Sequence, residues 1–168
     1  MQYYLTLENG IRGAGITPDG TFPTGAVECT AAQYQDANAW TISNGQIVAY
    51  APPAPTLAQQ AAAALGAGLT ITSTGTPALN GTYAVASGVP FGREDIGTEA
   101  QFISTFSEFT NGTQTLEWPL IDGKTFVTFP NTATFMNFAK AAAQYYAAVK
   151  AVAATGQGSF PSNQVTIP

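Results

Sequence analysis

The sequence predicts an α+β protein made of two small modules, with antiparallel hairpin sheets, helices packed on them and a long C-terminal helix. Three observations predict this fold class. Asn-Gly and Asp-Gly pairs recur between β-prone segments, and these residues tolerate the positive φ that tight hairpin turns require. Helix-capping patterns occur between the hairpins. A proline run, "APPAPT" at residues 51–56, divides the chain.

The proline run sets the expected domain boundaries. Residues 1–50 are expected to form an N-terminal β-rich module in the order β-β-α-β-β, and residues 57–156 a C-terminal α+β domain in the order α-β-β-α-β-β-α. Because proline fixes φ, residues 51–56 form a stiff linker that spans about 19 Å at ~3.1 Å per residue. Residues 157–168 form an extended tail, whose "QVTI" can pair as an edge strand with this chain or with a neighbour. The alternative for residues 51–56 is an ordinary surface loop.

Two hairpins have the clearest signals. "TISNGQIV" places Asn44-Gly45 between short β-prone arms, and "LEWPLIDGKTFVTF" does the same around Asp122-Gly123. Leu116, Trp118 and Leu120 alternate along the strand before the second turn. The other turn pairs are Asn9-Gly10, Asp19-Gly20, Asn80-Gly81 and Asn111-Gly112.

Three shorter helices are also expected. Thr30 followed by Gln33 is a capping-box pattern, and Thr98 followed by Gln101 repeats it. A helix is expected over residues 56–65, ended by Gly66. The helix after Thr98 is predicted to present three aromatic residues on one face: Phe102, Phe106 and Phe109.

The longest helix is expected over residues 132–155, with Gly156 as its stop. One face shows heptad spacing, with successive intervals of 3, 4, 3, 4 and 3 residues. Two interpretations remain open: this face packs on the domain's own sheet, or it forms a seam with a partner helix. The opposite face is mostly Ala, with Lys140, Gln144 and Lys150. The heptad face supplies the candidate interface residues, which are Phe135, Phe138, Ala142, Tyr145, Val149 and Val152.

Composition argues against several kinds of partner. Charged residues make up only 9% of the chain, and a surface so poor in charge suits a protein that covers much of it with neighbours. The five basic residues do not cluster, whereas nucleic-acid binding needs several Lys or Arg to neutralise phosphates. No apolar run reaches the ~20 residues that span a bilayer. We therefore expect no nucleic-acid and no membrane partner.

The residues also offer little for catalysis. With no histidine, a Ser-His-Asp or Cys-His nucleophile and most zinc sites are excluded. The single cysteine, Cys29, forms no internal disulfide and is expected to be a small buried hydrophobe. The close carboxylate sets are Glu94-Asp95 and Glu117 with Asp122, but Asp122 is explained by its turn and Glu117 should face solvent. We expect no enzyme activity, no cofactor and no metal.

Several segments resemble bacteriophage tail proteins. "FPTGAVECTAAQY" (residues 22–34), the hairpin "NGQIVAY" and the proline run followed by "TLAQQAAAAL" resemble the N-terminal module of tail-fibre assembly and related tail proteins. "GLTITSTGTPALNGTYAV" (residues 68–85), "LEWPLIDGKTFVTF" (residues 116–129) and the Phe- and Ala-rich helix after them are similar to a C-terminal domain of unknown function found in phage tail proteins. Family members often carry more charge in the linker and last helix. The resemblance carries over no catalytic residue.

The resemblance implies a non-catalytic phage tail structural protein that binds a tail-fibre or baseplate component in the virion and is assembled in the host cytoplasm. Self-association is a further option. The alternative within this class is a tail-fibre assembly chaperone. The alternative from another class is a glycan-binding or carbohydrate-active module, in which Tyr3, Tyr4 and Trp40 would stack on sugars unless they pack in the core or the hairpin.

Overall fold

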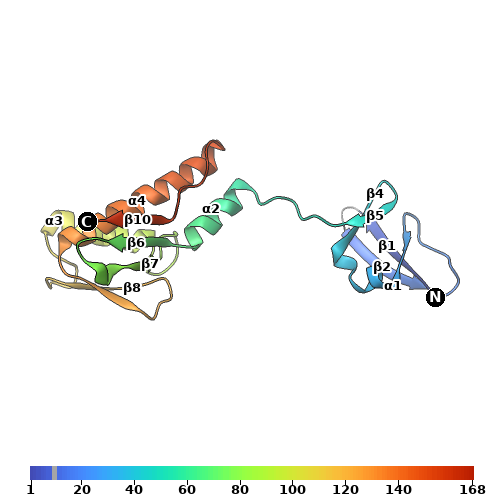
Figure 1. Ribbon diagram of the computed structural model, residues 1–168, viewed down its shortest axis with the longest axis horizontal. Helices are drawn as coiled ribbons and strands as arrows, with labels where there is room; N and C mark the ends of the chain where they lie inside the picture. Colours follow the sequence, from blue (N-terminus) through green and yellow to red (C-terminus); the bar gives the residue numbers. More distant parts are fainter. Residues whose placement is uncertain (9–10) are drawn as a thin grey trace. The chain divides into compact units, whose positions relative to one another are not determined.

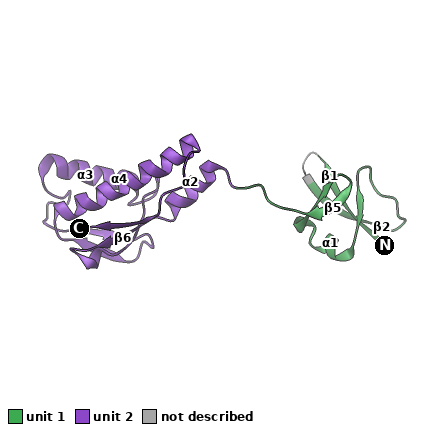
Figure 2. Ribbon diagram, turned by 45° about the horizontal axis from the view of Figure 1, so that its top comes forward, with its two compact units in different colours: residues 1–54 green, residues 55–168 purple. Residues whose placement is uncertain are grey.

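The computed structural model describes residues 1–8 and 11–168 and shows an α+β fold. The chain divides into two compact units, Met1–Ala54 and Pro55–Pro168, which are coloured separately in Figure 2. The division falls inside the proline run. The predicted Asn9-Gly10 turn lies outside the described residues.

Unit 1 contains short strands and one short helix. Strand β1 (Gln2–Glu8) lies between β2 (Ile11–Thr17) and β3 (Val27–Cys29), and both pairings are antiparallel. Strand β3 was not predicted from the sequence. Helix α1 (Ala31–Gln35) begins with the predicted capping box. The Thr30 side chain accepts a hydrogen bond from the Gln33 backbone N–H, and the Gln33 side chain accepts one from the Thr30 backbone N–H.

The predicted Asn44-Gly45 hairpin is confirmed in unit 1. After the 3₁₀ turn η1 (Ala37–Ala39), strands β4 (Trp40–Ser43) and β5 (Gln46–Ala49) pair directly around it. Both turn residues have positive φ, 50° at Asn44 and 74° at Gly45. These are the angles that a two-residue hairpin turn needs to match the twist of its strands.

Unit 2 begins with helix α2 (Leu57–Gly66), which Thr56 caps together with Gln59. The helix includes Gly66, so the predicted stop is slightly early, and the positive φ falls at Gly68 (77°). An added Cβ at Gly68 would lie 2.6 Å from the carbonyl oxygen of Tyr83. Gly68 therefore permits both the turn and the close approach of the next strand.

A three-stranded sheet forms the centre of unit 2. Strand β6 (Leu69–Ser73) lies between β7 (Gly81–Tyr83), which follows the 3₁₀ turn η2 (Pro77–Leu79), and β10 (Gln164–Ile167). Figure 1 shows β10, in red, beside β6. The pair β6–β7 is antiparallel, as expected, whereas β10 runs parallel to β6. Residues 164–167 are an edge strand of this unit.

Helix α3 (Arg93–Phe106) starts earlier than predicted. Gly92 is its N-cap, Glu94 and Asp95 occupy the first turn, and the expected capping box at Thr98 is absent because Thr98 lies inside the helix. The buried residues of the helix are Ile96, Glu99 and Ile103. The predicted aromatic face holds in part: Phe102 and Phe106 pack on each other with ring centres 4.7 Å apart, although Phe106 is 60% exposed, whereas Phe109 lies beyond the end of the helix and is fully buried.

The second predicted hairpin is confirmed as β8 (Leu116–Pro119) and β9 (Phe126–Phe129). Helix α4 (Thr132–Thr155) has its predicted bounds, with Asn131 as N-cap and Gly156 in the left-handed conformation after it. Helix α4 contacts β6, β9 and β10. Between these elements lies an aromatic core of unit 2, formed by Tyr83, Phe109, Trp118, Phe129, Phe135 and Phe138.

Candidate functional site

The heptad face of α4 lies inside unit 2. Phe135, Phe138, Ala142, Tyr145 and Val149 are buried in the core, and Val152 is half-buried. Burial in the same unit leaves no surface for a partner helix at the five buried positions. Of the two interpretations of the heptad face, the structure therefore supports packing on the domain's own elements. The interpretation of this face as a seam with a helix of another chain is wrong.

The exposed face of α4 has its own regular spacing. Six of its residues follow intervals of 4, 3, 4, 3 and 4, and all six are exposed. We call this set the 136–154 stripe. It consists of Met136, Lys140, Ala143, Ala147, Lys150 and Ala154.

A groove of about 810 Å³ lies between helix α3 and the first four residues of the 136–154 stripe. Buried side chains line it from below, including Val85, Ile96 and Ala139. Small residues of both helices line its walls, among them Gly97 and Ala143. A second groove of about 510 Å³ lies against helix α2 and is lined from α4 by Tyr146, Lys150, Ala153 and Ala154. Because Tyr146 lines both, the two largely apolar grooves follow one another along the same side of α4, and residues of the stripe line each of them.

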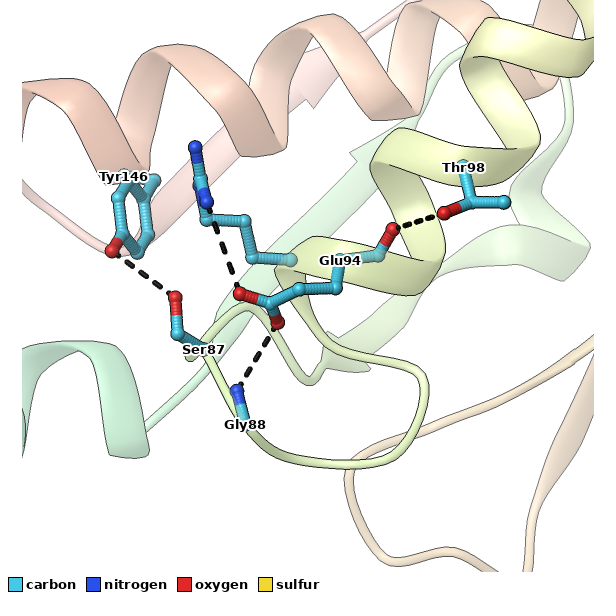
Figure 3. Close-up of polar contacts among 6 residues, drawn as sticks. Ser87, Gly88, Glu94, Thr98 and Tyr146 are labelled. Carbon is cyan, nitrogen blue, oxygen red and sulfur yellow. Dashed lines mark hydrogen bonds and ion pairs between the residues drawn. The ribbon is translucent and has the colours of Figure 1, made fainter.

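Tyr146 lines both grooves and joins a polar cluster at the first turn of α3 (Figure 3). The guanidinium carbon of Arg93 lies 4.6 Å from the centre of the Tyr146 ring, within the range of a cation–π contact. The Tyr146 hydroxyl lies 3.2 Å from Ser87 Oγ. These contacts link α4 to the loop that precedes α3.

Glu94 organises the same loop. Its Oε2 accepts a hydrogen bond from the Gly88 backbone N–H at 3.1 Å, and its Oε1 lies 3.8 Å from Arg93 Nη1 (Figure 3). The Gly88 N–H is the largest influence that lowers the pKa of Glu94. Thr98 Oγ1 donates to the Glu94 backbone carbonyl at 2.9 Å. Glu94 is thus an ionised carboxylate that holds the loop through the Gly88 N–H. A general acid needs a raised pKa, which is the opposite of what this environment produces.

Two of the other three carboxylates considered from the sequence also accept hydrogen bonds from backbone groups. Asp95 accepts from the Phe91 N–H, and Asp122 accepts from the N–H groups of Thr125 and Lys124. These bonds, the one from Thr125 first, lower the pKa of Asp122 to about 2. Glu117 is exposed on β8, as expected. The geometry gives these four side chains structural or solvent-facing positions.

A second surface feature was not predicted from the sequence. Four large apolar side chains are each at least 40% exposed around a groove of about 490 Å³: Val89, Phe91, Ile121 and Phe126. We call these four residues the apolar patch. They come from the loop before α3 and from the β8–β9 hairpin, so only the folded chain brings them together. The one signal for this patch in the sequence was Phe126, a large apolar residue at a solvent-facing position of its strand.

Phe91 has an unusual backbone. Its φ is 56°, in the left-handed region that residues other than Gly, Asn and Asp rarely enter. Its ring meets Trp118 edge-on, with the ring centres 5.4 Å apart, yet 43% of the side chain remains exposed. Strained residues of this kind concentrate at functional sites.

The aromatic residues considered for sugar stacking lie in unit 1 and are half-buried. Tyr3 packs on Tyr34 and Tyr4 on Phe22, with ring centres 5.1 Å and 5.7 Å apart. Trp40 lies in β4. The contacts of Tyr3 and Tyr4 support the interpretation that these rings pack within the unit, and not the interpretation that they form an open surface for stacking on sugars.

Cys29 is buried, and burial raises the pKa of its thiol, which agrees with the expected small hydrophobe. Across residues 1–8 and 11–168, no three His, Cys, Asp or Glu side chains gather where they could hold a metal ion. None of the helices in this part of the chain has the length and apolar content needed to cross a bilayer.

No family model, curated protein or solved structure matches the chain.

Proposed function

We propose that this protein is a non-catalytic structural component of a bacteriophage tail, and that unit 2 binds a tail-fibre or baseplate protein through the apolar patch. In this proposal the protein is assembled in the host cytoplasm and remains in the virion tail. The phage assignment rests on the resemblance of residues 22–34, 68–85 and 116–129 to phage tail proteins.

The apolar patch is the observation that carries the binding role. Large apolar side chains grouped around a groove mark protein–protein contact sites more often than scattered exposed residues do. Aromatic anchors such as Phe91 and Phe126 dominate the energy of many interfaces. The left-handed backbone of Phe91 costs free energy, and a partner that covers its ring would offset that cost.

The two-unit organisation supports the same role. The proline run joins two compact units, so each unit can engage its own partner while the linker keeps the two contacts close. The low charge of the chain agrees with extensive contact, because few ionic groups must be desolvated when a neutral surface is covered.

The test is co-expression of the tagged full chain with the tail-fibre and baseplate proteins encoded beside its gene. We expect one of them to copurify and to form a complex in size-exclusion chromatography with light scattering. The double variant Phe91→Asn, Phe126→Thr should weaken that complex at least about tenfold. Asn tolerates the left-handed backbone and Thr suits a strand, so both changes remove a ring and preserve local geometry.

Phe106→Ser is the matched control, because Phe106 is a highly exposed aromatic residue outside the apolar patch. It should leave the complex intact. Circular dichroism must show that both variants are folded. The proposal fails if no tail protein binds, or if both variants bind equally well. Mass spectrometry of purified virions then distinguishes a permanent tail component from an assembly chaperone, which would bind the fibre and be absent from the particle.

A further inference from the structure

We propose that the 136–154 stripe of α4 is a second docking surface, which binds an acidic amphipathic helix of a partner protein. This surface is distinct from the apolar patch, and the proposal does not depend on a phage role. It rests on the shape of the stripe, on its side chains and on the charge of its two lysines.

The shape favours a helical partner. The stripe residues are spaced 4, 3, 4, 3 and 4 apart, which is the spacing with which one helix packs along another. From residue 136 to residue 154 the stripe covers about 27 Å at 1.5 Å per residue. The grooves of about 810 and 510 Å³, which follow one another beside it, can receive apolar side chains of a helix laid along the stripe.

The backbone argues against an extended partner at this place. Helices α3 and α4 satisfy their own N–H and C=O groups along most of their length, so they offer no ladder of hydrogen bonds to a strand. A helix brings its backbone groups already paired. Ala143, Ala147 and Ala154 leave room for its close approach.

Charge specifies the partner further. Within the described part of the chain, the one ion pair joins Arg93 and Glu94, so Lys140 and Lys150 have no carboxylate within 4.0 Å. Lys140 lines the α3 groove and Lys150 lines the α2 groove. The two lysines are about 15 Å apart along the helix axis. Carboxylates about three turns apart on a partner helix would complement them.

The test uses the full chain and two synthetic labelled peptides of about 18 residues, or five helical turns. Both peptides have leucines at the same heptad positions. In one peptide these leucines are flanked by glutamates, and in the other by lysines. Fluorescence anisotropy measures their affinities at low and at moderate salt. We expect the glutamate peptide to bind about tenfold or more tightly than the lysine peptide, and to weaken as salt increases.

The decisive variant is Lys140→Glu, Lys150→Glu, which should reduce affinity for the glutamate peptide about tenfold. Lys124→Glu is the matched control, since Lys124 is an exposed lysine of the same unit between β8 and β9. Ala147→Trp, at an exposed position, should obstruct both peptides while circular dichroism shows an intact fold.

Equal binding of the glutamate peptide to wild type and to the double lysine variant would overturn the proposal. So would the absence of saturable binding at about 100 µM peptide, or an equal loss in Lys124→Glu. Light scattering on the protein alone provides a further check. A dimer that dissociates in the double lysine variant would assign the stripe to a second copy of this chain, which also overturns the proposal.

Discussion

The hydroxyl of Tyr145 donates a hydrogen bond to the backbone carbonyl of Ala64, 2.9 Å away, and so joins the middle of helix α4 to helix α2. The neighbouring Tyr146 points its hydroxyl to Ser87 at the surface instead. Burial raises the pKa of Tyr145, which keeps its hydroxyl a neutral donor. Two adjacent tyrosines therefore have different roles, one in the core and one on the rim of the grooves.

This difference predicts unequal effects of removing each hydroxyl. Tyr145→Phe should lower the free energy of unfolding by about 0.5–1.5 kcal/mol, because the carbonyl of Ala64 loses its buried donor. Tyr146→Phe should change it by less than about 0.5 kcal/mol, because water can replace the lost contact and the ring over which Arg93 lies remains. Urea denaturation of both variants measures the difference. Equal losses would contradict the assigned positions.

The aromatic core gives a second prediction. Phe138→Ala should destabilise unit 2 by about 3–5 kcal/mol, since Phe138 is fully buried against Tyr83 and Phe129. Phe106→Ala removes the same ring from an exposed helix position and should cost little, within about 0.5 kcal/mol. Thermal and urea unfolding of both variants test this. If Phe138→Ala instead left the monomer stable and only altered its association, the buried assignment of the heptad face would be wrong.

A third prediction concerns the independence of unit 2. All residues of the main buried cluster, from Ala61 to Ile167, belong to this unit. A fragment of residues 55–168 should therefore unfold cooperatively when heated, and close to the temperature of the same transition in the full chain. Differential scanning calorimetry provides the comparison. An aggregated or unfolded fragment would mean that the two units stabilise each other.

A fourth prediction follows from Asp122. Its pKa in the folded protein is lowered from 3.8 to about 2, chiefly by the backbone N–H of Thr125. Because the folded value is the lower one, Asp122 stabilises the β8–β9 turn above about pH 3.8, and this contribution is lost as the pH falls toward 2. The urea midpoint of wild type should therefore approach that of Asp122→Asn, which does not titrate, between pH 4 and pH 2.

The Asp122 titration can also be observed directly. Carboxyl carbon shifts in NMR should give a midpoint near pH 2 for Asp122. A midpoint near 3.8, or a difference between wild type and Asp122→Asn that does not change with pH, would show that the turn does not hold the carboxylate as described.

Local signals were sufficient for much of the secondary structure. The cap at Thr30, the start of helix α2, the Asn44-Gly45 turn and helix α4 followed the predictions closely. Each depends on atoms only a few residues apart, so a short stretch of sequence contains all the interacting groups. Helix α3 shows the limit: its capping pattern at Thr98 was present, but the helix begins at Arg93.

Association between distant segments was beyond such signals. The apolar patch required Phe91 and Phe126 to meet from separate elements, and no local pattern links them. The same holds for the parallel pairing of β10 with β6. Parallel strands pair through a long crossover, so their register depends on everything that folds between them.

The sequence by itself determined that residues 132–155 form a helix, and it showed two faces, one rich in large apolar residues and one of Ala and Lys. Only the tertiary structure decided what each face does. Phe138 and Val149 are buried because β6, β9 and β10 supply a surface to cover them, and that surface comes from segments far apart in the chain. Lys140 and Lys150 stay exposed because α2 and α3 pack beside the stripe and leave it open. Heptad spacing describes the periodicity of a helix, but which elements cover each face depends on the free energy of the whole fold.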